Sequence, residues 1–452
     1  MIPRNPFPAK HRPAWTPRRE FLKTIGTAAL AMPFIASELR ANPPSSRVRH
    51  AAFGTSAQAW ADLLQISSAP NLEVVALCDV DEGRAGQARK KFPKARFYTD
   101  WRKLLEAEAG NIDSVNVATP DHMHAPIGVS AMLLGKHIFG EKPLAHNLHE
   151  TRRMTEIARE KGLVTQMGIQ SHSGAYYRTG VRAIRDGLIG KVKEVHSWCF
   201  KTWGDNSLLP THTDPVPKGF DWDLWLGVRE ARPFIGKGYY HPGNWRKRLD
   251  FGVGTLGDMA CHILDPVFSA LDISVPLSVR SEGPAPNATN WALDAKVILT
   301  FAGSARTNGP LKLTWYDGAQ RLPAEVAALL EGRRIPQGGS IFIGTDGVLF
   351  LEHSSVPARL FPSAKFKGVK LPLEKSMNHY HHFIEAVRGG PKPEANFDFA
   401  GPLTEAVLLG GVASRFPNTD LKWDAAALRF EHAPANQFVR QEYRKGWEVP
   451  GL

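Results

Sequence analysis

Asp258 and His262 have types and spacing suited to the oxidation of an alcohol, and Lys142 is of a type that could assist them. In that reaction a proton leaves the oxygen while a hydride leaves the carbon, and a histidine can accept the proton because its pKa is near neutrality. Asp258 and His262 are four residues apart, so on an α-helix they would share one face. A lysine beside them could stabilise negative charge on the same oxygen. The alternative is a surface Asp–His pair and a solvated lysine.

A second group of residues has the pattern of a dinucleotide-binding site. Gly54 follows a predicted strand at 48–53, and Asp79 ends a second predicted strand at 72–78. A glycine turn after the first strand, with an acidic residue 20–25 positions later, is typical of such sites. The carboxylate of Asp79 would accept hydrogen bonds from ribose and repel a 2′-phosphate, which favours NAD over NADP. Of the usual three glycines only Gly54 is present, so an ordinary strand–helix turn is the alternative.

Polar residues also follow two of the later strands predicted in this half, at 112–118 and 136–139, and a final strand is predicted at 164–167. The carboxyl ends of parallel strands lie at one edge of a sheet, where ligands gather. The residues that we expect to contact the cofactor are Gly54, Ser56, Ala57, Asp79, Val80, Thr119, Pro120, Asp121, His124, Glu141, Lys142 and Gln170.

The segment 221–248 is rich in tryptophan and tyrosine, whose rings stack well on sugars. It directly precedes Asp258, so both could contribute to one pocket. The expected substrate contacts are Tyr240, His241, Trp245 and Arg246; packing within a loop is the alternative. The histidines at 379, 381 and 382 do not share one helical face and have no carboxylate partners in a known metal motif, so we expect no metal site.

Two kinds of domain must position these residues. Strands alternate with helices up to about residue 170, which predicts an α/β Rossmann domain with a doubly wound parallel sheet over 47–170. From about residue 191 the pattern changes to longer alternating strands at 192–200, 291–301, 310–315, 340–343 and 347–351, with helices at 377–387 and 402–413. This predicts an α+β domain with a large, mostly antiparallel open sheet over 171–432, followed by an arm at 433–452 that wraps over the domain or a neighbour.

The motif Glu141-Lys142-Pro143, with residues 119–122 (Thr-Pro-Asp-His) upstream, resembles the Gfo/Idh/MocA oxidoreductase family, which includes glucose–fructose oxidoreductase and inositol dehydrogenases. Matching segments at 168–170, 187–190 and 252–262 extend the resemblance over most of the chain, and 399–405 and 443–447 are similar to its exported branch. The resemblance implies that Lys142 lies beside the nicotinamide and touches the reacting hydroxyl. It also implies that Asp258 and His262 face the substrate and that a cis peptide bond precedes Pro143.

With this resemblance, we expect His262 to accept the proton, Lys142 to act as its electrostatic partner, and Asp258 to orient the histidine or contact a sugar. The predicted function is NAD-dependent oxidation of a hydroxyl on a sugar, glycoside or cyclitol, with NAD held tightly and regenerated in place. One alternative is redox-neutral cleavage of a glycoside by oxidation, elimination, addition and reduction. Another is a catalytically silent carbohydrate-binding protein. In the family the open sheet builds oligomer contacts, so a homodimer or homotetramer is expected.

The N-terminus predicts export. Arg18-Arg19 and Phe21-Leu22-Lys23 precede a short apolar stretch, as in a twin-arginine signal, here assigned to residues 1–41. A periplasmic or otherwise exported protein follows from this; a basic N-terminus with a chance arginine pair, on a cytoplasmic dehydrogenase, is the alternative. The net charge of +12 is scattered rather than striped, so nucleic acid is not an expected partner. No apolar run is long enough for stable membrane insertion, and three cysteines provide no disulfide framework.

Overall fold

The computed structural model describes residues 47–452. The predicted export signal at 1–41 therefore lies outside the described residues. Within residues 47–452, no helix is both long enough and apolar enough to cross a membrane. The cysteines Cys78, Cys199 and Cys261 are all free and buried.

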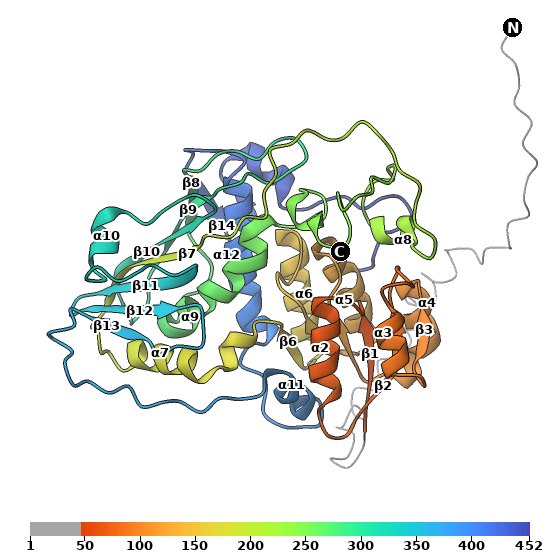
Figure 1. Cartoon of the computed structure of the whole chain (residues 1–452), viewed down its shortest axis with the longest axis horizontal. Coiled ribbons are helices and arrows are strands. Elements are labelled where there is room, and N and C mark those ends of the chain that lie inside the picture. The colour runs from red at the N-terminus through yellow and green to blue at the C-terminus, as the bar shows by residue number, and fades with distance from the viewer. Residues whose placement is uncertain (1–46) are drawn as a thin grey trace, which may run out of the picture. The chain divides into compact units, whose positions relative to one another are not determined.

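The N-terminal half forms a six-stranded sheet in the order β3-β2-β1-β4-β5-β6, and every strand pair in it is parallel (Figure 1). This confirms the predicted Rossmann domain. The order reverses beside β1, where β2 lies on one side and β4 on the other, so a crevice opens at the carboxyl ends of β1 and β4. The strands are β1 (Val48–Phe53), β2 (Leu72–Cys78), β3 (Arg96–Tyr98), β4 (Ser114–Val117), β5 (His137–Gly140) and β6 (Thr165–Met167).

Five helices connect these strands: α2 (Gln58–Ser67), α3 (Gly86–Lys91), α4 (Trp101–Glu108), α5 (His124–Leu133) and α6 (Leu148–Glu160). Two of them begin with a side-chain cap. The carboxylate of Asp100 accepts a hydrogen bond from the backbone N–H of Arg102, and Asn147 accepts one from Glu150. Helix α5 is buried over nearly its whole length, which explains its apolar sequence on all faces.

The C-terminal half forms a nine-stranded sheet in the order β13-β12-β11-β7-β10-β9-β8-β14-β15. Only β7 and β10 pair in parallel, so the mostly antiparallel sheet is also confirmed. The strands are β7 (Val192–Cys199), β8 (Ser278–Ser281), β9 (Lys296–Phe301), β10 (Thr307–Asp317), β11 (Gly338–Gly344), β12 (Val348–Glu352), β13 (Arg359–Phe361), β14 (Leu421–Asp424) and β15 (Arg429–Phe430).

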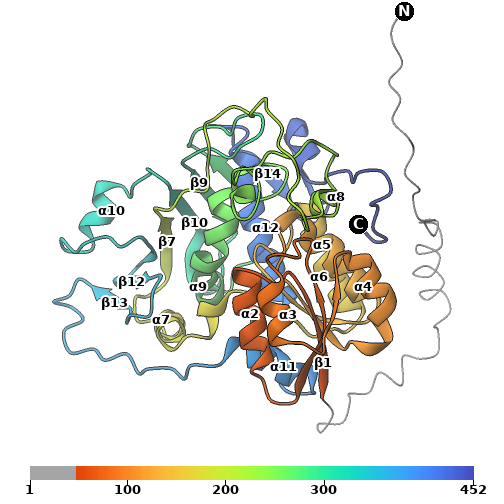
Figure 2. The same ribbon diagram turned by 45° about the vertical axis from the view of Figure 1, so that its right-hand side comes forward.

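Helices join the two sheets into one core. Helix α12 (Phe397–Ala413) packs against α6 of the first half and against β8 and β9 of the second, while α9 (Cys261–Leu271) packs on β7 and β11. Helix α7 (Ala175–Arg185) lies on α9, and α11 (His379–Val387) lies on α2. Both views show α12 between the two sheets (Figures 1 and 2). Helices α11 and α12, which come late in the sequence, thus pack back against the Rossmann domain.

The other face of the large sheet is partly covered within the chain. Leu322, Val326 and Leu330, around α10 (Ala324–Ala328), pack on Trp198 and Phe350 from the sheet. The expected homo-oligomer through this face stays a prediction, and α10 reduces the area that it would offer.

The C-terminal arm contacts the Rossmann domain of its own chain. The hydroxyl of Tyr443 donates to Glu150 of α6 at 2.8 Å, and the Arg102 guanidinium of α4 lies 4.1 Å from the ring centre of Trp447. The arm begins with the 3₁₀ helix η6 (Ala433–Phe438). The arm thus lies on the Rossmann domain of its own chain, and a contact with a neighbouring subunit stays a prediction.

Candidate active site

A cavity of about 400 Å³ lies at the carboxyl ends of β1, β2, β4 and β5. Its other wall comes from residues 200–255, which join β7 to the π-helical turn η5 (Leu256–Ala260) and which we name the connecting segment. The size is in the range of small-molecule sites. The expected site residues that line it are Gly54, Ser56, Ala57, Asp79, Val80, Thr119, Pro120, Asp121, His124, Glu141, Lys142, His241, Trp245, Arg246 and Asp258.

One end of the cavity fits a dinucleotide. Gly54 has a φ of +90°, and a Cβ there would lie 2.4 Å from the carbonyl oxygen of Ala118, so only glycine allows β1 and β4 to approach this closely. Among the described residues, no side chain caps the N-terminus of α2, so its first N–H groups are free to bind a diphosphate. Of the three glycines usual in such a turn, only Gly54 is present, and it stands at a position where the backbone requires glycine.

Asp79 is fixed at the end of β2 by its neighbours. Its carboxylate accepts hydrogen bonds from the backbone N–H of Thr55 at 3.0 Å and from the Thr55 hydroxyl at 2.7 Å. Burial raises its pKa above the ordinary value, although these hydrogen bonds oppose the shift. Arg84 also lines this end and donates to the hydroxyl of Ser56 at 3.2 Å. The glycine turn and the strand end are thereby held together as one rigid edge.

Lys142 is positioned by the loop that follows β5. The peptide bond from Lys142 to Pro143 is cis, as the family resemblance implied. Glu141 lies behind the lysine, where Gln170 donates to its carboxyl group at 3.1 Å. Burial and the neighbouring Asp62 raise the pKa of Glu141 well above its ordinary value, although the charge of Lys142 opposes the shift.

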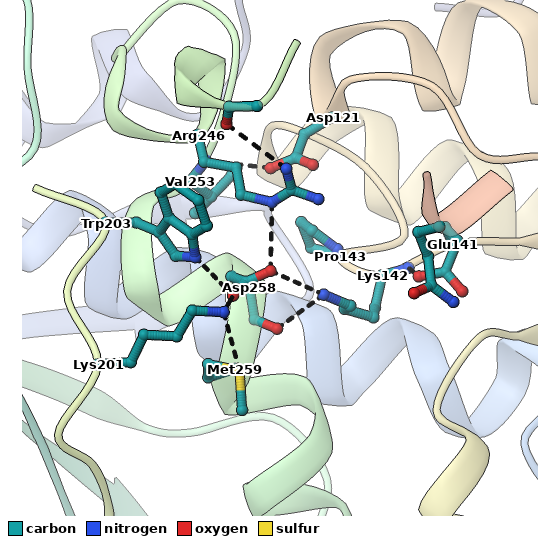
Figure 3. Close-up of polar contacts among 12 residues, drawn as sticks. Asp121, Glu141, Lys142, Pro143, Lys201, Trp203, Arg246, Val253, Asp258 and Met259 are labelled. Carbon is teal, nitrogen blue, oxygen red and sulfur yellow. Dashed lines mark hydrogen bonds and ion pairs between the residues drawn. The ribbon is translucent and has the colours of Figure 1, made fainter. Parts of the chain in front are cut away.

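The Lys142 side chain points at Asp258 (Figure 3). Its Nζ lies 3.0 Å from the Asp258 carboxylate and 2.8 Å from the Asp258 carbonyl oxygen. Burial lowers the pKa of Lys142, but the charges of Asp258 and Glu141 outweigh it, so the pKa lies above its usual value. The lysine is therefore a charged donor, not a base.

Asp258 is surrounded by donors from three parts of the chain (Figure 3). Oδ1 accepts from Lys142 and from Arg246 Nε at 3.2 Å, while Oδ2 accepts from Lys201 Nζ at 2.6 Å and Trp203 Nε1 at 2.7 Å. Burial raises the pKa of Asp258, but the cations outweigh it and hold the pKa far below its usual range. Asp258 is thus a permanent anion whose two carboxylate oxygens each accept two hydrogen bonds.

Asp121 is the pocket carboxyl whose pKa lies near neutrality. Burial raises its pKa to about 7, against the charges of Arg246 and Lys142. Its Oδ2 accepts the backbone N–H of Val253 at 3.1 Å, which links the Rossmann domain to the connecting segment. It can exchange a proton at physiological pH.

Three expected site residues do not line the cavity. His262 lines a separate small cavity, with its ring centre 5.8 Å from that of His353. Burial and the charge of Lys142 lower its pKa well below the ordinary value. Asp258 lies in a π turn, and both of its carboxylate oxygens accept hydrogen bonds from Lys142, Arg246, Lys201 and Trp203. The expected pairing of Asp258 with His262 is therefore replaced by pairing with cations.

The other two lie nearby but act on neighbours. Gln170 binds Glu141 rather than facing the cavity. Tyr240 is buried in an aromatic cluster with Trp222, Trp225 and Phe251, so packing explains it. His124 does line the cavity, but its two ring nitrogens face the carbonyl oxygens of Pro143 and Thr119, each at 2.8 Å. It positions the lysine loop.

Sequence reasoning missed Lys201, Trp203 and Arg84, which also line the cavity. Lys201 and Trp203 follow the end of β7, so they come from a strand of the second sheet. The signal was available for Lys201, since it is a charged residue directly after a predicted strand. Nothing in the sequence shows that this strand end lies opposite the Rossmann edge.

The connecting segment crosses the β2 side of the Rossmann domain. The backbone N–H of Glu82 donates to Gly219 at 2.8 Å, and that of Asp221 donates to Val80 at 2.9 Å. His241 lies 2.9 Å from the carboxylate of Asp81 and stacks on Phe220 with ring centres 4.8 Å apart. These contacts cover the edge where a bound dinucleotide would place its adenosine end.

Comparisons with known proteins agree with this architecture. A family profile described as "Oxidoreductase family, NAD-binding Rossmann fold" matches residues 49–169, and one described as "Oxidoreductase family, C-terminal alpha/beta domain" matches residues 187–449. The WlbA dehydrogenase from Bordetella pertussis, solved with NADH and UDP-GlcNAcA, has a similar fold, with a TM-score of 0.59 and 17% identity over 84% of this chain and 99% of that one.

Two characterised relatives are similar in sequence over shorter regions. Levoglucosan dehydrogenase of Pseudarthrobacter phenanthrenivorans is 26% identical over 182 residues, which is 40% of this chain and 38% of the relative. The alpha-N-acetylgalactosaminidase of Shewanella oneidensis is 27% identical over 203 residues, 39% of this chain and 44% of the relative. The chain thus spans less than half the length of either. Both halves match their family profiles, however, and the chain belongs to the Gfo/Idh/MocA oxidoreductase family, with an NAD-binding Rossmann domain.

Proposed function

We propose that this protein is an NAD-dependent oxidoreductase that acts on a hydroxyl group of a sugar, glycoside or cyclitol. The observation that carries the proposal is one cavity in which the dinucleotide edge, with Gly54 and Asp79, continues into the cluster of Lys142 and Asp258. A bound cofactor and a substrate would therefore meet at Lys142. The related levoglucosan dehydrogenase supports a sugar-like substrate.

Each side chain has a defined part in this reaction. Lys142, held in its charged form by Asp258, donates a hydrogen bond to the substrate oxygen and stabilises the negative charge that develops there. Asp121 accepts the hydroxyl proton, because it is the lining carboxyl with a pKa of about 7. This assignment replaces His262, which lies outside the cavity. When bound, NAD supplies the hydride acceptor.

We further propose that NAD stays bound and is regenerated in place. The connecting segment crosses the cofactor edge through the contacts of Glu82, Asp221 and His241, and a cofactor under it would exchange slowly. A retained cofactor must be reoxidised on the enzyme. Either a second substrate does this, or the oxidised sugar is reduced again after its glycosidic bond has been broken. The related alpha-N-acetylgalactosaminidase favours keeping the second route as a candidate.

The proposal is tested on protein purified without added nucleotide. Denaturation should release about one NAD(H) per chain, detected by mass spectrometry. Addition of a suitable glycoside should raise absorbance at 340 nm once per site in a single turnover. Steady product formation without added NAD would support recycling, whereas a strict need for added NAD would overturn it. A protein that binds sugars but never reduces NAD would be the silent carbohydrate-binding alternative.

The proposed location is outside the cytoplasm, reached by the twin-arginine route, which exports folded proteins and would carry a preloaded cofactor. Replacing Arg18 and Arg19 with lysine should retain the protein in the cytoplasm of a bacterial host that has this route. Cell fractionation measures the result, and replacing Arg4 and Lys10 with alanine is the control. Export that is unchanged by the paired lysines would contradict the proposed signal.

A further inference from the structure

The substrate end of the cavity carries more positive than negative charge. Lys142, Lys201 and Arg246 all bind a single carboxylate, that of Asp258. Asp121, whose pKa burial raises to about 7, adds a negative charge only when it is ionised. The three cations therefore exceed the carboxylates of Asp258 and Asp121 by one to two charges. A neutral sugar would leave this surplus unbalanced in a partly desolvated site, which is costly.

The other two cations of the cluster, Arg246 and Lys201, lie against tryptophan rings in positions that suit ligand binding. The guanidinium of Arg246 lies 4.2 Å from the ring centre of Trp245 and 5.4 Å from that of Trp203. Lys201 Nζ lies 5.1 Å from the same Trp203 ring. Stacking fixes the guanidinium plane and leaves its edge available for hydrogen bonds. Within residues 47–452, Asp258 and Gly243 accept from Arg246 Nε and NH1, while NH2 has no acceptor.

Lys201 also has unused capacity. An ammonium group has three N–H donors, and the Lys201 side chain, which is 46% exposed, directs donors to Asp258 and, at 4.0 Å, to the sulfur of Met259. Lys201 and Arg246 both line the cavity and both contact the carboxylate that Lys142 contacts. An anionic group on the substrate could reach them while a hydroxyl of the same molecule lies at Lys142.

We propose that the substrate is an acidic sugar, whose carboxylate binds Lys201 and Arg246 while a ring hydroxyl is presented to Lys142. This inference rests on the proposed function and specifies its substrate class. Arginine favours carboxylates because its two parallel donors match the two oxygens. A single carboxylate also matches the surplus charge near neutral pH, when Asp121 is partly ionised.

The test compares matched sugars that differ in one group. Methyl glucoside, methyl glucuronide and methyl glucoside 6-phosphate, with their galacto and manno counterparts, are titrated by calorimetry into the full-length protein with its nucleotide. We expect one of the uronides to bind at least about tenfold more tightly than its neutral partner, since hydrogen bonds to charged groups are the stronger ones. Equal binding of both, no binding of any uronide, or tighter binding of the phosphate would overturn the proposal.

Substitution links the preference to the residues. The preference for the uronide is the dissociation constant of the neutral sugar divided by that of the uronide. In Lys201→Met this ratio should fall at least about fivefold. Lys218→Met, which replaces an exposed lysine of the same connecting segment outside the cavity, should keep the ratio. An unchanged ratio in Lys201→Met would overturn the assignment. Absorbance at 340 nm, followed separately, reports hydride transfer. If the protein prefers a uronide but never reduces NAD, the proposed reaction is wrong and the acidic ligand stands. If only neutral sugars lead to reduction of NAD, the proposed reaction stands and the acidic substrate is wrong.

Discussion

Lys142 stays protonated although it is largely buried, because the neighbouring Asp258 stays ionised. The lysine side chain is 11% exposed and the aspartate 7%, yet both are ionised because three further groups, on Arg246, Lys201 and Trp203, donate to the same carboxylate. A buried pair of this kind needs such additional partners to offset its desolvation. The substrate oxygen would thus meet a donor whose position is fixed before binding.

Removal of that charge should stop hydride transfer but not cofactor binding. In Lys142→Met we expect kcat/KM to fall by about a hundredfold or more, since one electrostatic donor at a reacting oxygen has an effect of that size. Nucleotide released on denaturation should stay near one per chain. Lys103→Met, at an exposed position on α4, is the control. Unchanged activity in Lys142→Met would favour a binding protein over an enzyme.

Asp121 should give the reaction its pH dependence. A proton acceptor works only when it is ionised, and burial raises the pKa of Asp121 to about 7, so activity should rise as pH increases through 7. In Asp121→Asn the rise should disappear and kcat should fall by about a hundredfold, while the amide oxygen can still accept the N–H of Val253. The measurement is the pH profile of kcat, with the exposed Asp186→Asn as control. A rise through pH 7 that survives in Asp121→Asn would exclude this role.

Some of the individual site residues could be predicted from the sequence. Lys142 and Asp258 were recognisable because each lies in a distinctive local motif, and the structure brings them together. Lys201 and Trp203 were not, since their role depends on a contact between β7 and η5 that no local pattern encodes. His262 lines another cavity, and spacing in sequence could not show that four other side chains donate to Asp258.

Among the elements, the connecting segment has the largest consequence for the cofactor. Its aromatic residues, expected to face a sugar, mostly pack on one another in a cluster that includes Phe220, Trp222, Trp225 and Tyr240. This packing gives a long segment without extended strands a core of its own. The segment can therefore hold a defined position across the Rossmann edge, with His241 on Asp81 as a fixed contact.

Loss of that contact should loosen the cofactor. In His241→Ala the stacking on Phe220 and the hydrogen bond to Asp81 are both removed, so we expect the dissociation constant of NAD to rise about tenfold. Nucleotide retained through repeated gel filtration is the measurement. His212→Ala, an exposed histidine of the same segment, is the control. Equal retention by both variants would mean that the segment does not restrain the cofactor.

Elements themselves were predictable where local patterns were strong. Strands β1 and β2 have the predicted bounds because each is a short apolar run ended by a polar or glycine residue. Strand β9 begins at Lys296 rather than at 291, since Trp291 lies outside the sheet and donates its indole N–H to the carbonyl oxygen of Gly252 at 2.7 Å. The short strands β8, β14 and β15 were missed because two to four residues carry too little periodicity.

Over the whole molecule, a buried ion pair joins the two domains. His172, just after the Rossmann sheet, lies 2.8 Å from Asp265 of α9 and 3.4 Å from Glu394. Burial lowers the pKa of His172, but the two carboxylates outweigh it and raise the pKa to about 9. Tyr177 and Arg178 of α7 are the other titratable groups close by. The charge on His172 therefore contributes to the stability of the folded protein.

This pair predicts a loss of stability at alkaline pH. Because the folded pKa is raised, the contribution is full below the unfolded pKa of about 6.5 and disappears as pH rises through about 9. The shift corresponds to about 3 kcal/mol at most. His172→Asn should be less stable than the unsubstituted protein at pH 6, with a difference that shrinks toward pH 10, whereas His212→Asn should show no such trend. Denaturant unfolding across this pH range measures it, and a constant difference would contradict the assignment.

Because the C-terminal arm packs on the N-terminal domain, that domain can be completed only after the rest of the described chain has been made. A ribosome makes the dinucleotide-binding strands first, yet their outer helices α4 and α6 receive Trp447 and Tyr443 only after the strands of the second sheet have been made. Helices α11 and α12, which cover α2 and α6, are also late products. The first domain to emerge is thus the last to be finished. In a nascent chain the nucleotide edge would stay uncovered until the connecting segment has been made, and the outer helices until the arm has been made.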